Sequence, residues 1–388
     1  MKFANRMKYL RASEIRDLLK VTEKPEMISF AGGMPASELF PSEIIRSGMN
    51  SVLSTEPETA LQYASTEGYA LLREKVALRM ENKFQAHAET DQILITSGSQ
   101  QGLDFTGRLF LDEGSVVLCE SPTYLAAINA FRTYLPRFLE MPTDADGVIP
   151  DSLEKILHET QDIRLIYVIP DFQNPTGNSW SVKRREAFME VVSRFDTAVL
   201  EDNPYGELRY EGNPLPSLLS MDKHGQVIFT GTFSKILCPG FRLGWIAASR
   251  EIIKKYVLLK QGADLHTAMI TQMCMNNILE NFDLENHIAL LRQVYRSRRD
   301  TMLEAVESFL PEDVHSSHPE GGLFLWLTLS DGLNARLLLE KSLEQNVAFV
   351  PGGSFFPNGG HENTLRLNFS YMPEEKIIEG IKRLGAVI

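Results

Sequence analysis

The segment "FTGTFSKILCPGFRLGWIA", residues 229–247, decides how the chain can fold. Its residues are nearly all apolar or small, yet it contains Lys235 beside Ser234, with Arg242 further along. A buried ammonium group is costly unless it is paired, or unless it gives up its charge to take part in chemistry. The segment therefore predicts a buried strand that leads into a site where the lysine has a function.

Other short apolar runs also stop at clusters of Gly, Pro, Ser or Asn. The five runs and the clusters that end them are "QILIT" with "SGSQQG", "SVVLC" with "ESPTY", "RLIYVIP" with "DFQNPTG", "TAVL" with "EDNPYGE", and "QVIFTGT" with "FSK". Uninterrupted runs of Val, Ile and Leu are typical of strands that are covered on both faces.

Helical patterns alternate with these runs, as in residues 100–114 and 181–196. This alternation predicts an α/β fold with a mainly parallel, doubly wound sheet. Ligands bind such sheets beyond the carboxyl ends of the strands, which is where all five polar clusters fall. The clusters therefore predict a single site that includes Lys235.

The C-terminal part of the chain has a different pattern. A long amphipathic helix is expected over residues 280–310, followed by "GGLFLWLTL", a second helix, "VAFVPGGSFF" and "TLRLNFSY". These segments predict a smaller α+β domain. We expect a large domain at residues 45–285, and a small domain formed by residues 286–388 together with the N-terminal segment 1–44.

Composition narrows the possible functions. The chain has 388 residues, a net charge of −12 and a pI of about 5.3, which argues against nucleic acid as the main partner but leaves anionic small molecules open. The three cysteines are far apart, as expected for reduced thiols in a cytoplasmic protein. The sequence shows no signal peptide, no membrane span and no HExxH pattern, so we expect neither a membrane nor a metal partner.

The strand-end clusters contain the groups that a phosphorylated ring would need. Gly98, Ser99 and Gln100 lie between a strand and a helix, where free N–H groups suit a phosphate. Ser234 and Arg242 could add a hydroxyl and a guanidinium group to the same phosphate. A surface salt bridge is the alternative for Arg242, although its apolar neighbours disfavour it.

A second set of residues suits the ring itself. Asp202 ends its strand and needs a cationic partner, which a protonated ring nitrogen would supply. Asn174 and Tyr205 could form hydrogen bonds, and Tyr124 offers a flat surface for stacking. Taken singly, these would be a turn asparagine and packed tyrosines. Taken together with Lys235, they favour a Schiff base to pyridoxal phosphate, with the ring as an electron sink.

Longer motifs then support a family resemblance. They are "FAGGMP", "LQYASTEGY", "TSGSQQGLD", "ESPTY", "QNPTG", "EDNPY", "FSKILCPGFRLGW" and "ENTLRLNFS", with "KQGADLHT" and "VAFVPGGSFF" in addition. The chain resembles the fold-type I pyridoxal-phosphate aminotransferases from about residue 12 to its end. Within them it is most similar to the 2-aminoadipate and kynurenine aminotransferase group.

The resemblance implies a role for each candidate residue. Lys235 would bind the cofactor covalently, Asp202 would pair with the ring nitrogen, Asn174 and Tyr205 would hold the ring hydroxyl oxygen, and Tyr124 would stack on the ring. The phosphate would be held by Ser99, Gln100, Ser234 and Arg242, and by Tyr63 from the partner subunit of a homodimer. The substrate would be bound by Arg366 through its α-carboxylate, and by Gly33, Asn174 and Arg16. Cys238 stands where a serine is expected, beside the lysine.

The implied reaction is transamination between an L-amino acid and a 2-oxo acid such as 2-oxoglutarate. Candidate amino donors are 2-aminoadipate, aromatic amino acids and branched-chain amino acids. One alternative is a pyridoxal-phosphate-dependent lyase, cleaving a C–S bond or decarboxylating its substrate, because its core would look almost the same. A cofactor-sensing transcription regulator is disfavoured, since "FAGGMP" begins at residue 30 and no basic patch is present.

Overall fold

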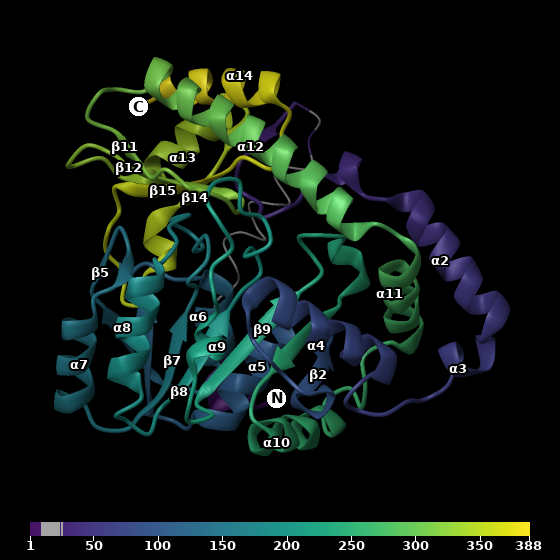
Figure 1. Cartoon of the computed structure of the whole chain (residues 1–388). Helices are drawn as coiled ribbons and strands as arrows, with labels where there is room; N and C mark the ends of the chain where they lie inside the picture. The colour runs from purple at the N-terminus through teal and green to yellow at the C-terminus, as the bar shows by residue number, and fades with distance from the viewer. Residues whose placement is uncertain (9–23, 25) are drawn as a thin grey trace.

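The computed structural model describes residues 1–8, 24 and 26–388 (Figure 1). Its centre is a seven-stranded sheet. The strands lie in the order β2 (Ile93–Thr96), β10 (Gly244–Ala247), β9 (Val227–Thr232), β8 (Ala198–Asp202), β7 (Ile163–Val168), β3 (Val116–Glu120) and β4 (Arg137–Met141). All neighbours from β9 to β4 pair in parallel, whereas β10 is antiparallel to both β2 and β9. The predicted mainly parallel sheet is therefore confirmed.

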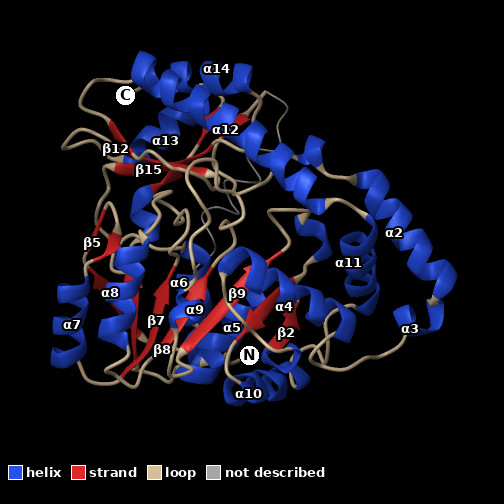
Figure 2. Ribbon diagram, viewed as in Figure 1, coloured by secondary structure: helices blue, strands red, loops and turns tan. Residues whose placement is uncertain are grey.

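Helices cover both faces of this sheet (Figure 2). One face packs against α5 (Ser99–Phe110), α6 (Leu125–Arg132) and α10 (Arg250–Gln261). The other face packs against α4 (Ala70–Phe84), α7 (Pro150–Glu159), α8 (Val182–Val192) and α9 (Leu218–Met221). Covered on both sides, the strands bury almost all of their residues, as their uninterrupted apolar runs predict. The doubly wound arrangement is confirmed as well.

The C-terminal part contains a four-stranded antiparallel sheet. Its strands lie in the order β11 (His315–Ser316), β12 (Phe324–Thr328), β15 (Thr364–Asn368) and β14 (Val350–Pro351). Its helices are α12 (Leu284–Phe309), α13 (Ala335–Glu344) and α14 (Glu374–Gly385). The long helix α12 begins after Asp283, whose carboxylate accepts the N–H of Asn286 and so caps the first turn.

An N-terminal segment joins this part of the molecule. Strand β1 (Ile28–Ser29) pairs in parallel with β13 (Val347–Ala348), and Phe30 is hydrogen-bonded on either side to Ala348 and Asn368. The residues after β1 are thereby held between the small sheet and the large one. The division into domains at residues 45 and 285 stays a prediction.

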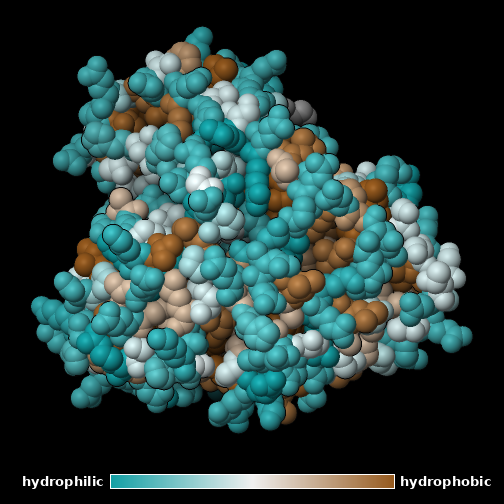
Figure 3. All heavy atoms as spheres, in the orientation of Figure 1, coloured by the Kyte–Doolittle hydropathy of each residue, from teal (hydrophilic) through white to brown (hydrophobic). Residues whose placement is uncertain are grey.

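The remaining helices lie along one side of the molecule (Figure 1). They are α2 (Ser42–Thr55), α3 (Pro57–Leu61) and α11 (Met269–Asn281). Separately, β5 (Thr143–Asp144) and β6 (Gly147–Val148) pair as a short antiparallel hairpin. The face in Figure 3 is mainly hydrophilic, with hydrophobic residues gathered over the region of α2, α3 and α11. Leu53 of α2 and Leu61 of α3 are exposed, as are Leu71 and Leu78 of α4. In the described part of the chain, every helix is too short or too polar to span a membrane.

Candidate active site

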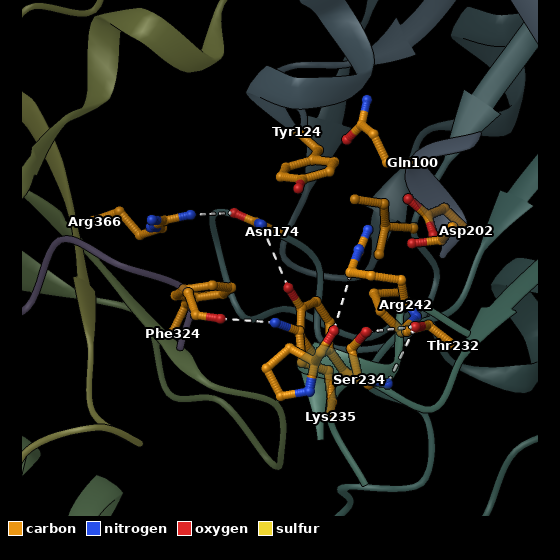
Figure 4. Close-up of a pocket in the computed structure, with 16 residues that line it drawn as sticks. Gln100, Tyr124, Asn174, Asp202, Thr232, Ser234, Lys235, Arg242, Phe324 and Arg366 are labelled. Carbon is orange, nitrogen blue, oxygen red and sulfur yellow. Dashed lines mark hydrogen bonds between the residues drawn. The ribbon is translucent and has the colours of Figure 1, made fainter. Parts of the chain in front are cut away.

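The polar clusters at the strand ends converge on one cavity of about 240 Å³ (Figure 4). Contributions come from the residues after β2, β3, β7, β8 and β9, from the N-terminal segment and from the small sheet. Most of the predicted residues line this cavity, namely Gly33, Ser99, Gln100, Tyr124, Asn174, Asp202, Tyr205, Ser234, Lys235, Arg242 and Arg366. The cavity therefore lies at the carboxyl ends of the parallel strands, where the sequence predicts it.

The turn after β2 has the shape of an anion site. Gly98 precedes α5 with a φ of 80°, a left-handed conformation that favours glycine. A Cβ atom at Gly98 would lie 2.5 Å from Nη2 of Arg242, so only glycine lets the guanidinium approach the turn. Ser99 and Gln100 form the first turn of α5, where helix N–H groups lack intrahelical acceptors. Arg242 itself is exposed.

The end of β9 lies beside this turn. The Thr232 hydroxyl donates to Oγ of Ser234 at 2.9 Å and accepts the backbone N–H of Ser234 at 3.1 Å. These bonds fix the direction of the Ser234 side chain at the edge of the cavity. A hydroxyl, a guanidinium group and a helix N-terminus thus meet in one corner of the site, which suits a phosphate group.

Lys235 lies at the cavity wall with its amine held by a backbone carbonyl. Its Nζ donates to the oxygen of Gly33 at 2.7 Å. Burial, followed by the positive charges of Arg366 and Arg242, lowers the pKa of Lys235 to about 8. A lysine with such a pKa has a substantial neutral fraction near neutral pH, and the neutral amine is the form that attacks a carbonyl carbon.

Asp202 is a buried carboxylate with one free oxygen. Its Oδ2 accepts from the Tyr167 hydroxyl at 2.8 Å, whereas Oδ1 has no hydrogen-bond partner among the described residues. Burial raises the pKa of Asp202 to about 7, while the hydrogen bond from Tyr167 acts in the opposite direction. A cationic N–H group would satisfy Oδ1 and favour the charged carboxylate.

Three polar side chains lie between these groups. Nδ2 of Asn174 donates to the Tyr205 hydroxyl at 3.5 Å, and both residues are buried. Burial raises the pKa of Tyr124 and of Tyr205, so both hydroxyl groups keep their protons and can donate. Figure 4 shows the Tyr124 ring turned toward the space between Asn174 and Asp202.

Arg366 enters the cavity from β15 of the small sheet. Its Nη1 donates to Oδ1 of Asn174 at 2.8 Å and its Nη2 to the oxygen of Ala31 at 2.7 Å. The guanidinium carbon lies 4.1 Å from the ring centre of Phe324 and 5.0 Å from that of Phe355. Burial lowers the pKa of Arg366 to about 10, so the group is still a cation at neutral pH. Its Nε has no partner among the described residues, which leaves donors for a carboxylate.

Tyr63 and Cys238 do not line the cavity. Tyr63 is 79% exposed and packs edge-on against His266, with 5.9 Å between the ring centres. Arg16 lies outside the described residues. Cys238 is buried in the hydrophobic core close to Lys235 in the chain, so it acts as a packing residue there.

Several residues that hold the cavity side chains in place were not predicted from the sequence. Tyr167 holds Asp202, Thr232 orients Ser234, and Phe324 covers Arg366. The motif "QNPTG" does single out the loop that follows Tyr167, but no local signal distinguishes a tyrosine inside a buried strand from a core residue.

These groups fit pyridoxal phosphate. The phosphate corner, the unpaired oxygen of Asp202 and the lysine of lowered pKa are three features that this cofactor needs, and the ends of β2, β8 and β9 bring them together in one cavity. Fold and site together define a fold-type I pyridoxal-phosphate enzyme.

Comparisons with known proteins agree. The family model "Aminotransferase class I and II" matches residues 27–384. Aromatic-amino-acid aminotransferase 1 from Thermococcus litoralis is 45% identical over 390 residues, which cover 100% of this chain and 94% of the relative. The chain therefore belongs to the class I and II aminotransferase family.

Two solved structures are similar over nearly the whole chain. Kynurenine aminotransferase from Pyrococcus horikoshii, in complex with PMP, has a TM-score of 0.95 and 43% identity, covering 99% of this chain and 96% of that one. LysN, the alpha-aminoadipate aminotransferase from Thermus thermophilus, complexed with N-(5'-phosphopyridoxyl)-L-leucine, has a TM-score of 0.92 and 42% identity, covering 99% and 96%. The protein is thus a pyridoxal-phosphate-dependent aminotransferase. The comparisons favour transamination over the lyase and regulator alternatives.

Proposed function

We propose that Lys235 bonds covalently to pyridoxal phosphate in this cavity and moves the proton during transamination. Asp202 faces the ring nitrogen, Asn174 and Tyr205 bind the ring hydroxyl oxygen, and Tyr124 stacks on the ring. The phosphate is held by Ser99, Gln100, Ser234 and Arg242. The observation that carries this assignment is the free Oδ1 of Asp202 in the same cavity as an amine of lowered pKa.

The bound cofactor supplies an electron sink that stabilises negative charge on the α-carbon of the amino acid. The protein supplies the proton transfer, because Nζ of Lys235 accepts the α-proton once the substrate amine has taken its place. The carbonyl of Gly33 lies 2.7 Å from that Nζ and holds it on the side of the cavity formed by the N-terminal segment. Proton transfer by a positioned group typically contributes about 10² to 10⁴ in rate.

Arg366 binds the α-carboxylate of every substrate. It donates to Asn174 and Ala31, and its remaining N–H groups, including Nε, are the donors for the carboxylate. Phe324 and Phe355 pack against the guanidinium group and restrict its movement. Because all amino acids carry an α-carboxylate, Arg366 contributes affinity without discriminating between side chains.

We further propose that acidic and aromatic amino acids are donors. The relatives named above are an aromatic-amino-acid, a kynurenine and an alpha-aminoadipate aminotransferase. Arg16 is the candidate cation for a side-chain carboxylate, which would favour 2-aminoadipate, glutamate and 2-oxoglutarate. The competing role for Arg16 is a surface ion pair worth less than about 1 kcal/mol.

We also propose that the protein forms a homodimer with shared active sites and that it is cytoplasmic. Tyr63 is exposed at the surface, and so is Leu61, two residues before it in the chain. Leu265, which precedes the contact residue His266, is exposed as well. An exposed group of apolar residues is typical of a protein contact. In the dimer, Tyr63 would reach the phosphate of the partner subunit. Three free, buried cysteines support a reducing compartment.

The test is to reduce the holoenzyme with borohydride and map the modified peptide. We expect the cofactor on Lys235 in the wild type, and neither adduct nor transamination in Lys235→Ala. The exposed residue Lys255 provides the control, because Lys255→Ala should keep both. An adduct on another lysine would refute the assignment. Product analysis with glutamate and 2-oxoglutarate separately tests whether an amino group is exchanged.

A further inference from the structure

The motif "KQGADLHT", residues 260–267, contains a charged cluster that the functions above do not use. Lys260 is the last lysine of α10 and its side chain is wholly buried, whereas Lys254 and Lys255 on the same helix are exposed. Burying an ammonium group costs several kcal/mol unless hydrogen bonds and an opposite charge compensate it. The contacts of Lys260 therefore indicate what the burial achieves.

Nζ of Lys260 has three partners. It donates to the carboxylate oxygens of Asp264 at 2.9 and 3.0 Å, to Oγ1 of Thr267 at 3.0 Å, and to Oε1 of Gln101 at 2.7 Å. All three N–H groups of the ammonium are thus used. Gln101 belongs to α5, so the cluster connects the end of α10 with the helix that begins at the phosphate corner.

The same partners hold the turn in front of α5. Oε1 of Gln101 also accepts the backbone N–H of Ser97 at 2.9 Å, and Nε2 of Gln101 donates to Oδ2 of Asp264 at 2.8 Å. The Ser97 hydroxyl donates to the same oxygen of Asp264 at 2.9 Å. Ser97 and Gln101 flank Gly98, whose left-handed conformation shapes the turn. The cluster therefore holds both ends of the turn through residues that do not themselves line the cavity.

We propose that Lys260 is a positioning residue for the phosphate group of the cofactor. Through Gln101 and Asp264 it holds residues 97–101 in the shape that brings Ser99 and Gln100 to the cavity wall. This inference rests on the proposed function, since it takes Ser99 and Gln100 as phosphate ligands. Lys260 does not line the cavity, so it acts through these residues.

The positive charge of Lys260 should also favour phosphate binding, because it offsets the negative charge of Asp264. Asp264 is a carboxylate close to the turn, and Lys260 neutralises it within the cluster. Burial by itself would raise the pKa of Asp264, but the hydrogen bonds from Gln101, Lys260 and Ser97 and the charge of Lys260 together lower it, so Asp264 stays charged. Without Lys260, an uncompensated negative charge would remain beside a site for a dianion. Replacing Lys260 by a neutral residue should therefore weaken phosphate binding in particular.

The experiment compares pyridoxal phosphate with pyridoxal, which has the same aldehyde and ring but no phosphate. Dissociation constants for both are measured by absorbance on the full-length enzyme after removal of the resident cofactor, for wild type, Lys260→Met and the control Lys255→Met. We expect Lys260→Met to bind pyridoxal phosphate roughly 10- to 100-fold more weakly, the range for lost hydrogen bonds to a charged group. Binding of pyridoxal should change less than about threefold, and Lys255→Met should match wild type.

Further variants separate the possible results. Asp264→Asn added to Lys260→Met should recover part of the phosphate affinity, because it removes the uncompensated charge. If Lys260→Met does not fold, Gln101→Ala cuts the same connection to Ser97 and should show the same selective loss. An equal loss for both ligands, or no loss in a folded variant, would overturn the proposal. If Arg242→Ala also leaves the preference for the phosphorylated ligand unchanged, the phosphate assignment itself is wrong.

Discussion

Replacing Asp202 by Asn should stabilise the cofactor-free enzyme in a pH-dependent way. Asp202 is 3% exposed and its Oδ1 has no partner among the described residues. Burial raises its pKa from 3.8 to about 7. In the unfolded chain the carboxyl group ionises above its ordinary pKa, whereas in the folded chain it keeps its proton until the pH approaches 7. The free energy of unfolding therefore falls as the pH rises through this window.

The size of the effect follows from the two pKa values. A difference of about three units corresponds to about 4 kcal/mol, reached in full above pH 7 and absent below about pH 4. Asp202→Asn cannot ionise, so it should be more stable than wild type by about 4 kcal/mol at pH 8 and by only about 1 to 2 kcal/mol at pH 5. A bound cofactor with a protonated ring nitrogen would remove this advantage, because it pairs with the carboxylate of the wild type.

Glu201 provides a matched control on the same strand. Burial raises its pKa to about 7, but its side chain points to the opposite face, where it accepts the N–H groups of Leu218 and Leu219. Glu201→Gln should show a similar pH dependence in the cofactor-free enzyme. The cofactor should leave that dependence unchanged, because Glu201 does not line the cavity.

The assay is urea denaturation at pH 5, 6.5 and 8, with and without pyridoxal phosphate, at one protein concentration. If the difference between wild type and Asp202→Asn is the same at pH 5 and 8, the burial argument is wrong. If it persists with the cofactor bound, Asp202 does not face the ring nitrogen. With cofactor bound, kcat of Asp202→Asn should fall at least about 100-fold, about 3 kcal/mol of barrier.

Three further predictions concern the substrate and the second subunit. Mixed dimers of Lys235→Ala and Tyr63→Phe should regain part of the activity, because one of the two sites then carries neither change; heterodimers without any recovery would refute a shared site. Arg366→Gln should lower kcat/KM by a similar factor for acidic and apolar donors, about 30-fold or more, because the α-carboxylate loses its charge partner; a loss confined to one donor class would contradict this role. Arg16→Gln should lower kcat/KM for 2-aminoadipate but not for leucine or phenylalanine, and an equal change on all three would exclude Arg16 as the side-chain partner.

The centre of the fold could be predicted because its strands carry a simple signal. Strands covered on both faces need uninterrupted apolar runs, so β2, β3, β7, β8 and β9 stand out in the sequence. Two strands were not singled out. β4, "RFLEM", is an edge strand that contains exposed and charged residues, and β10, "GWIA", is the short antiparallel strand after the lysine loop. For both segments, pairing with the neighbouring strands determines the strand conformation more than their own composition does.

The site shows a similar division. Residues that follow strand ends were predicted because parallel strands bring their carboxyl ends to one edge. Tyr167 was not, because its contact with Asp202 depends on the register in which it pairs with Leu200 of β8. Phe324 meets Arg366 through the pairing of β12 with β15 in the other sheet. Such contacts are set by register and sheet arrangement, which no short motif specifies.

The N-terminal segment contributes mainly through its backbone, which the sequence pattern does not reveal. The carbonyl of Ala31 accepts from Arg366 of the small sheet, and that of Gly33 accepts from Lys235 of the large one. One short stretch thus binds the two cations that are proposed to act on the carboxylate and the amine of the substrate. A Cβ atom at Gly33 would lie 3.0 Å from Cζ of Phe324, which packs on Arg366, so a larger residue would have to displace that ring. The second glycine in "FAGGMP", Gly33, is therefore favoured by close packing over the arginine and not by its backbone conformation, since its φ lies outside the left-handed region.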